Sequence, residues 1–175
     1  IEGAQRTASI VDGLKGFSAL DGEEREAVAM DAVIERAIHW VKKGMNLDFD
    51  VQFQRCPGCT VRGNAGQLLQ VLMNLIQNAY AAASSQGGML PVLRITARQE
   101  PGWVSIALHD NGPGIAPEAL SHVFEPFFTT KPVGKGTGLG LSISYGIVER
   151  HGGQLSARNH PQGGAEFVLR LPGVK

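Results

Sequence analysis

The chain has 175 residues, 43% of them hydrophobic and 18% charged, a composition typical of one globular domain and not of a disordered or fibrous chain. Sixteen basic residues balance sixteen acidic ones, so the net charge gives no reason to expect a nucleic acid or an acidic membrane surface as partner. The longest apolar stretch, residues 68–83, is interrupted by Gln70, Asn74, Gln77 and Asn78. We therefore predict no transmembrane span, and no signal peptide is visible.

Apolar residues recur at helical spacing in three segments of the N-terminal half. This spacing predicts one helix up to about Leu20 and a second that starts at Asp31 as N-cap and ends at Gly44. A third, longer helix is predicted from an Asn64 cap to about Ser84. Between the second and third helices, alternation over residues 47–53 predicts a half-buried strand.

The C-terminal half is predicted to hold four strands and one helix. Strands are expected at residues 92–98 and 103–109, joined by a turn, and at 154–158 and 166–171 as a closing hairpin. The helix is expected at residues 139–150, ended by a glycine pair. Separate helices and hairpin-connected strands predict an α+β fold, a two-layer sandwich with helices on one face of a mixed, mostly antiparallel sheet.

Two cysteines, Cys56 and Cys59, are too few for a disulfide framework, which favours a reducing cytosolic setting. Their Cys-x-x-Cys spacing is compatible with a redox pair or with half of a metal site, although a structural zinc site needs four ligands. A solvent-facing turn at Pro57-Gly58 explains the same residues.

Two glycine motifs point to a ligand. Asp110 is expected at a strand end, followed by Gly112 and Gly114. A carboxylate there can accept a hydrogen bond from an exocyclic amino group, and the glycines let backbone approach a flat ligand, although an ordinary turn shows the same pattern. Residues 136–140 open a helix, where free N–H groups and the helix dipole favour a phosphate.

The long helix and the segment between the glycine motifs add further candidates. Asn74 and Asn78 lie one turn apart, roughly opposite the leucine stripe, and an Asn amide oxygen can ligate Mg²⁺; a solvated helix face is the alternative. Residues 124–131 carry three aromatics, which predicts either a core plug or a hinged lid. Lys131 and Lys135 add positive charge nearby.

The order and spacing of these motifs resemble the ATP-binding domain of sensor histidine kinases, in the Bergerat-fold (GHKL) superfamily. The resemblance runs from about Met30 to Leu171. It includes the N box at residues 74–79, the first glycine box at 110–115, the F box at 124–128 and the second glycine box at 136–141.

The resemblance implies roles for these residues, with ATP and Mg²⁺ as cofactors. Asn78 would ligate Mg²⁺, Asn74 would support the phosphates and Asp110 would accept from the adenine amino group. The adenine pocket would be shaped by Gly112, Gly114 and Ile115. The phosphates would be held by Lys131, Lys135, Gly136, Thr137, Gly138, Leu139 and Gly140, and the lid at residues 122–135 would be mobile without nucleotide.

Two positions depart from the family pattern. Many relatives carry a basic residue three positions after the Mg²⁺-binding Asn, where this chain has Ala81. Phosphate contacts would therefore depend more on the lid lysines. Relatives often have Thr after the Gly-Gly pair, where this chain has Ala165, so one hydroxyl near the adenine would be missing.

The resemblance implies a protein-histidine kinase that transfers the ATP γ-phosphoryl group to a His on a dimerisation helix absent from this chain. The phosphoryl group would then pass to an Asp on the receiver domain of a response regulator. Residues 1–22 resemble the second, truncated helix of the dimerisation hairpin, and residues 23–175 the catalytic ATP-binding domain. None of the five histidines has the acceptor context, so no catalytic residue is assigned and the chain is not expected to autophosphorylate alone.

The same resemblance implies an oligomeric state and a cellular location for the protein. The first residue is Ile1 rather than Met, which suggests a piece of a longer protein. That protein is expected to form a homodimer through the dimerisation helices, and to be cytoplasmic or the cytoplasmic part of a membrane-bound sensor. No nucleic acid and no membrane contact by this chain are expected.

Two other functions stay open. The ATP-hydrolysing branch of the superfamily places a Glu, as general base, four residues before the Mg²⁺-binding Asn. Here that position is Asn74, an amide that cannot accept a proton, so slow hydrolysis is expected. The third function is a non-catalytic nucleotide-sensing module.

Overall fold

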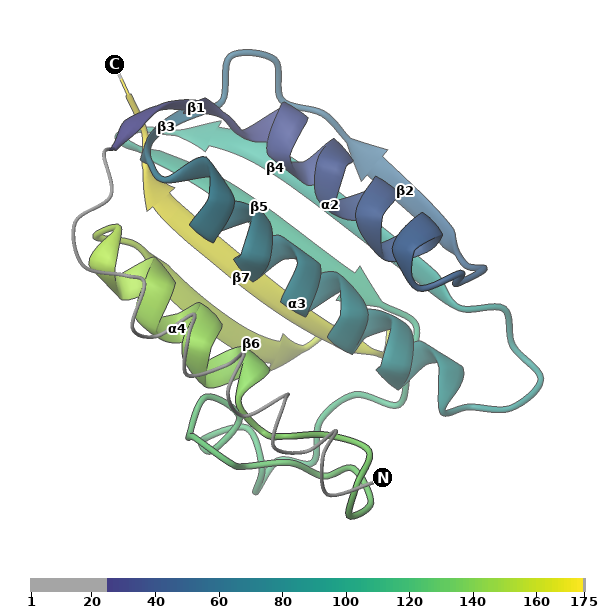
Figure 1. Cartoon of the computed structure of the whole chain (residues 1–175). Helices are drawn as coiled ribbons and strands as arrows, with labels where there is room; N and C mark the ends of the chain where they lie inside the picture. The colour runs from purple at the N-terminus through teal and green to yellow at the C-terminus, as the bar shows by residue number, and fades with distance from the viewer. Residues whose placement is uncertain (1–24, 175) are drawn as a thin grey trace.

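The computed structural model describes residues 25–174. Three helices form one layer, and a five-stranded sheet forms the other (Figure 1). This arrangement confirms the predicted α+β sandwich with helices on one face. The helices are α2 (Met30–Gly44), α3 (Ala65–Ser84) and α4 (Gly140–Arg150). The strands are β1 (Glu26–Ala29), β2 (Asp50–Gln54), β3 (Thr60–Gly63), β4 (Val92–Glu100), β5 (Trp103–Asp110), β6 (Gln154–Asn159) and β7 (Ala165–Pro172).

The large sheet has the strand order β2-β4-β5-β7-β6. β2 and β4 are parallel, and the other three neighbouring pairs are antiparallel, so the mixed, mostly antiparallel sheet is confirmed. Both predicted hairpins are present, β4–β5 and β6–β7. The sequence interpretation missed a second sheet, the β1–β3 ribbon, in which residues 26–29 pair with residues 60–63. The helix predicted up to Leu20 and the domain boundary at residue 22 lie outside the described residues.

The core forms between the helix layer and the sheet. α3 lies between α2 and α4 over the middle of the sheet (Figure 1). Its buried leucines, Leu68, Leu72 and Leu75, confirm the predicted apolar face. In β5 the alternate residues Val104, Ile106, Leu108 and Asp110 are buried, so Asp110 continues the apolar row that faces the helices. None of the helices within residues 25–174 has the length and apolar character needed to cross a membrane.

The helix starts show one correct and one wrong prediction. The Asn64 side chain accepts a hydrogen bond of 2.8 Å from the Gln67 N–H, which confirms Asn64 as the cap of α3. Asp31 is not a cap, because α2 begins at Met30 and its N-cap, Ala29, makes no side-chain hydrogen bond. The Asp31 carboxylate instead accepts the backbone N–H of Cys56, at 3.0 Å.

The oxidation state of the two cysteines also differs from the expectation of a reducing setting. Cys56 and Cys59 form a disulfide. Cys59 is 2% exposed and belongs to the core, and only Pro57 and Gly58 are exposed to solvent. Of the alternatives left open by the spacing, the structure contains the oxidised pair. In residues 25–174 no group of three or more His, Cys, Asp or Glu side chains is placed to hold a metal ion.

A buried histidine joins the end of α4 to the start of α3. The His151 Nε2 accepts the Asn64 N–H at 3.1 Å, so the proton must sit on Nδ1, which lies 2.8 Å from the Ile147 carbonyl oxygen. His151 is 6% exposed. Burial is the main cause that lowers its pKa below the ordinary value of 6.5. His151 is therefore neutral, and protonation would break the bond to Asn64.

We predict that acid weakens the fold through His151. Because the folded pKa is lowered, the unfolded chain binds the proton more readily, so stability is full above about pH 6.5 and falls as the pH drops through the folded pKa. Urea unfolding at pH 7.5 and pH 5.0 measures this loss. In His151→Gln the loss between the two pH values should be smaller; an equal loss in both proteins would contradict this role.

Candidate nucleotide-binding site

The N-box asparagines lie on the side of α3 that meets α4. The Asn74 amide nitrogen lies 3.3 Å from the Gly140 carbonyl oxygen and 3.2 Å from the Ser144 hydroxyl oxygen, and donates to both. Asn74 is half-buried, so the alternative of a solvated helix face is wrong for this residue. Asn78 is also half-buried and lies one turn further along α3. The N box and the start of α4 are thus joined directly.

Asp110 ends β5 as a buried carboxylate, 3% exposed. Its Oδ1 accepts the Gly112 N–H at 2.8 Å and the Ala165 N–H at 3.3 Å. Burial raises the pKa of this carboxyl, and the two backbone N–H groups oppose that rise. No described residue donates to Oδ2, so one oxygen of a desolvated carboxylate is available to a ligand.

Two glycines are required by the close packing around Asp110. Gly164 has a φ of +77°, and a Cβ there would lie 1.8 Å from the Asp110 carbonyl oxygen. A Cβ at Gly112 would lie 2.8 Å from the carbonyl carbon of Ala82 in α3. No side chain fits at either position. Sequence reasoning assigned Gly112 but missed Gly164, for which the Gly-Gly pair before Ala165 was the available signal.

Asn159, the last residue of β6, holds the first glycine box through hydrogen bonds. The Asn159 Oδ1 accepts the Ile115 N–H, and the Asn159 Nδ2 donates to the Ile115 carbonyl, both at 2.7 Å. Gly114, with a φ of +81°, passes so close to Asn159 that a Cβ would lie 2.7 Å from its Oδ1. Sequence reasoning missed Asn159, because nothing local marks a contact between residues 44 positions apart.

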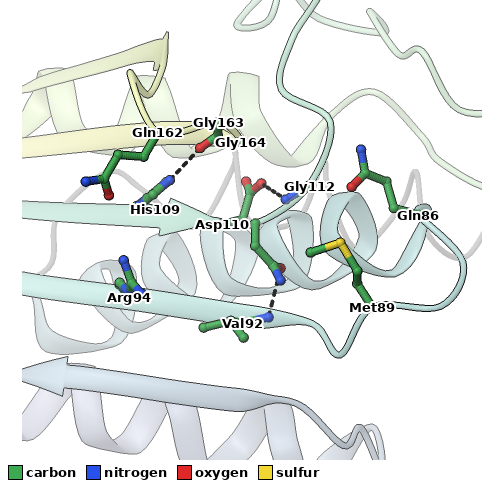
Figure 2. Close-up of a pocket in the computed structure, with 11 residues that line it drawn as sticks. Gln86, Met89, Val92, Arg94, His109, Asp110, Gly112, Gln162, Gly163 and Gly164 are labelled. Atoms are coloured by element: carbon green, nitrogen blue, oxygen red, sulfur yellow. Dashed lines mark hydrogen bonds between the residues drawn. The ribbon is translucent and has the colours of Figure 1, made fainter.

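A cavity of about 490 Å³ lies at the Asp110 end of β5 (Figure 2). Of the predicted adenine residues, Asp110 and Gly112 line this cavity, and Gly164, which the sequence analysis did not assign, lines it as well. Its other lining residues are Gln86, Met89, Val92, Arg94, His109, Asn111, Gln162 and Gly163. The asparagines of α3 and the second glycine box do not line it, so the adenine-side and phosphate-side residues do not share one cavity in this structure.

His109, beside Asp110 on β5, supports the turn between β6 and β7. Its Nε2 lies 2.7 Å from the Gly163 carbonyl oxygen (Figure 2). Its ring stacks on His160, with centroids 3.8 Å apart. This turn presents Gly164 and the Ala165 N–H to Asp110. His109 therefore supports the backbone beside Asp110, a role that sequence reasoning did not assign.

The three aromatics of the F box divide between core and surface. Phe124 packs on Tyr145 of α4 and on Phe167 of β7, with centroid distances of 5.2 and 6.2 Å. Phe127 is 67% exposed and has a φ of +66°, which is unfavourable for a bulky residue. The structure thus confirms the core plug for Phe124, whereas the hinged lid stays a prediction for the exposed part of the segment.

The F box and the second glycine box are held together through their backbones. The Phe127 N–H donates to the Gly138 carbonyl at 2.9 Å. Gly138 has a φ of +68°, and a Cβ there would lie 2.4 Å from the carbonyl carbon of Phe127. Between residues 126 and 140 the charged side chains are Lys131 and Lys135, both exposed. The segment is therefore a positively charged loop beside the start of α4.

Comparison with known proteins agrees with this geometry. Residues 63–175 match the family model of histidine kinase-, DNA gyrase B- and HSP90-like ATPases. The two-component sensor PprA of Pseudomonas aeruginosa is 51% identical over 67% of this chain and 13% of its own length. The mycobacterial sensor histidine kinase MprB has a TM-score of 0.70 at 31% identity, over 85% of this chain and 97% of that chain.

A third protein extends the match along the chain. The full-length structure of ShkA in complex with AMPPNP has a TM-score of 0.77 at 25% identity, over 95% of this chain and 36% of that chain. The chain belongs to the histidine kinase-, DNA gyrase B- and HSP90-like ATPase family, and within it to the histidine kinase ATP-binding catalytic domains. It spans about an eighth of PprA.

We predict that Asp110→Asn weakens ATP binding about 10- to 100-fold, the usual value of a hydrogen bond to a charged group. The variant keeps an oxygen for Gly112 and Ala165 but places an NH₂ group toward the adenine amino group. Calorimetric titration measures the affinity, with the exposed Asp50→Asn as matched control. Equal affinities for Asp110→Asn and wild type would contradict adenine recognition by Asp110.

The same titration has a pH signature. The pKa of Asp110 is raised above its ordinary value of 3.8. On acidification its carboxyl is therefore protonated at a higher pH than that of an ordinary aspartate. ATP affinity should therefore fall in wild type through that window, and less in Asp110→Asn. Folding stability should depend on pH in the opposite direction to ATP affinity. Because the folded state binds this proton more readily than the unfolded chain, the contribution of Asp110 to stability is present at low pH and is lost as the pH rises through the raised pKa.

Proposed function

We propose that this chain is the ATP-binding part of a two-component sensor histidine kinase, which transfers the γ-phosphoryl group of ATP to a histidine on a dimerisation helix that is not in this chain. The receiving histidine would pass the group to an aspartate on a response regulator receiver domain. The relatives that match are sensors of this kind, and their additional length leaves room for the acceptor helix.

One observation favours phosphoryl transfer over hydrolysis. Asn74 occupies the position from which an ATPase of this superfamily would use a general base, and its amide nitrogen donates to Gly140 and Ser144. An amide in that position cannot take a proton from water. Water attack on the γ-phosphate is therefore unassisted, and ATP is retained for a nucleophile supplied from outside.

One group of site residues would bind the adenine and another the phosphates. Asp110 would accept from the adenine amino group, with Gly112, Gly114 and Ile115 as the wall of the adenine pocket. On the phosphate side, positive charge would come from Lys131 and Lys135, and backbone N–H groups from Gly136, Thr137, Gly138, Leu139 and Gly140. Phosphoryl transfer of this kind needs positioning and charge stabilisation rather than covalent help from the domain.

Mg²⁺ fits the Asn78 side of α3. The family uses Mg²⁺ with ATP, and an amide oxygen is a hard, neutral ligand of the type Mg²⁺ accepts. No described acidic cluster competes for the ion, so phosphate oxygens and water would complete its coordination. When bound, the ion would neutralise charge on the phosphates; Asn74 would hold α4 in place beside them.

The rest of the protein is part of this proposal. Residues 1–22 would be the end of the dimerisation hairpin, and residues 23–175 the catalytic domain. The full-length protein would be a homodimer through that hairpin. The chain would work in the cytoplasm, alone or as part of a membrane-bound sensor, without contact to nucleic acid or lipid.

Incubation of the chain with γ-labelled Mg-ATP tests the function. We expect bound nucleotide, negligible phosphate release and no label on the chain, because the acceptor is missing. A longer form that includes the preceding helix should become labelled. Rapid phosphate release would instead assign the chain to the ATPase branch, and absence of binding would leave a nucleotide-independent interaction module.

We predict that Asn78→Ala lowers Mg-ATP affinity at least tenfold while the urea midpoint changes little, because the side chain is half-buried and makes no described hydrogen bond. The loss should be larger with Mg²⁺ than with excess EDTA, since it removes a metal ligand. Gln54→Ala, which removes an exposed amide from β2, is the matched control. Unchanged Mg-ATP affinity in Asn78→Ala would exclude the metal role.

A further inference from the structure

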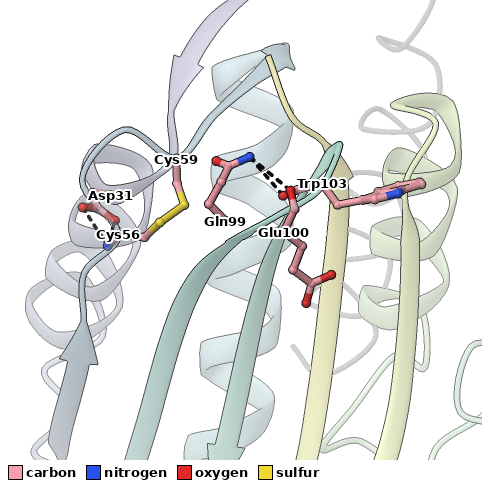
Figure 3. The surroundings of a disulfide bond; sticks show 6 residues. All are labelled: Asp31, Cys56, Cys59, Gln99, Glu100 and Trp103. Atoms are coloured by element: carbon pink, nitrogen blue, oxygen red, sulfur yellow. Dashed lines mark hydrogen bonds between the residues drawn. A yellow bond between two sulfur atoms is a disulfide. The ribbon is translucent and has the colours of Figure 1, made fainter. Parts of the chain in front are cut away.

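The Cys56–Cys59 disulfide closes the connection between β2 and β3 (Figure 3). No role in nucleotide binding uses this bond. It lies near Trp103 at the start of β5, whereas Asp110 ends that strand, about 23 Å away at the rise of an extended chain. The bond is therefore remote from the nucleotide site and needs a separate explanation.

The disulfide loop is attached to the start of α2 by two hydrogen bonds. The Cys56 N–H donates to the Asp31 carboxylate at 3.0 Å, and the Met30 N–H donates to the Cys59 carbonyl at 2.9 Å. Within the loop, the Cys59 N–H donates to the Cys56 carbonyl at 2.9 Å. A change in the loop therefore acts directly on the first turn of α2.

The same loop leads into the β1–β3 ribbon. Thr60, next to Cys59, pairs with Ala29, and the register continues to the pair of Gly63 and Glu26. A two-stranded ribbon this short is marginal by itself and depends on its attachments. β1 immediately follows residues 1–24 in the chain, so the ribbon is the junction between that segment and the ATP-binding unit.

The two cysteines differ in solvent exposure. Cys59 is 2% exposed, whereas Cys56 is half-buried beside the exposed Pro57-Gly58 turn. An external thiol can therefore reach Cys56 more easily than Cys59. The short Cys-x-x-Cys spacing keeps the two sulfurs near each other after reduction, which favours closure of the bond again.

We propose that Cys56 and Cys59 form a reversible thiol–disulfide site that controls the rigidity of the β1–β3 ribbon. A small thiol, as its thiolate, attacks the Cys56 sulfur; the protein S–S bond breaks and Cys59 leaves as a thiolate that takes up a proton. A second small thiol attacks the mixed disulfide and releases Cys56. Overall, one protein disulfide and two small thiols give two protein thiols and one small disulfide.

Reduction removes the covalent closure of the loop. The hydrogen bonds of the loop to Asp31 and Met30 remain, as do the contacts of Thr60 and Val61 with Gly173 and Val174. The β1–β3 ribbon should then open more often, and amide exchange should be faster at residues 26–31 and 60–63. A four-residue loop adds a modest stabilisation, so the melting temperature should fall by only a few degrees. ATP affinity should stay the same, because the bond and the nucleotide site are too far apart to interact directly.

The experiment equilibrates the chain in mixtures of reduced and oxidised glutathione, traps thiols with N-ethylmaleimide in denaturant, and counts the added groups by intact mass. The chain has two cysteines, so the count is zero or two, with glutathione adducts visible separately. We expect a reversible change from zero to two across the series. A bond that stays closed in fully reduced glutathione, or thiols that never close, would overturn the proposal.

Hydrogen exchange on the two end states tests the effect on the ribbon. We expect exchange at least tenfold faster at residues 26–31 and 60–63 in the reduced chain, and recovery on reoxidation. Cys56→Ala should exchange like the reduced chain in both buffers and is preferred to a change at the buried Cys59. Equal exchange in the oxidised and reduced chains would contradict control of the ribbon, whatever the outcome of the ATP experiments.

Discussion

The packing around the buried Asp110 carboxylate determines how the rest of the site is arranged. One oxygen takes N–H groups from Gly112 and Ala165, which join the first glycine box to the start of β7. Gly164 meets the Asp110 backbone so closely that no side chain fits. The carboxylate is therefore desolvated, held in one orientation and left with one oxygen for a ligand, which are the properties expected of a group that recognises an amino hydrogen.

Local signals predicted most of the fold. The Asn64 cap, the apolar stripe of α3 and the alternation in β5 each act within a few residues, and the structure confirms all three. The β1–β3 ribbon was missed because its strands are four residues long and 30 or more residues apart. Asp31 was wrongly predicted as a helix cap for a related reason. Its hydrogen-bond partner, the Cys56 N–H, is distant in sequence and comes close to Asp31 only in the folded chain.

The sequence predicts which residues form the candidate site but not the distances between them. The N box and the glycine boxes could be found from their order, whereas the supports of the site, Asn159 and His109, depend on the β6–β7 hairpin. The structure also separates the adenine-side cavity from the phosphate-side residues. The loop at residues 126–138 carries the strained, exposed Phe127, and the hydrogen bond from the Phe127 N–H to the Gly138 carbonyl joins the F box to the second glycine box.

A two-dimensional ¹H–¹⁵N NMR titration of the chain with Mg²⁺ and a non-hydrolysable ATP analogue tests the central claim most directly. The account predicts that the largest shifts fall in three separate segments, residues 74–78, 110–115 and 136–140, and that they saturate together with one affinity. Two results would contradict it: shifts limited to other residues of the cavity at the Asp110 end of β5, such as Arg94 and Gln162, or no saturable shifts at all.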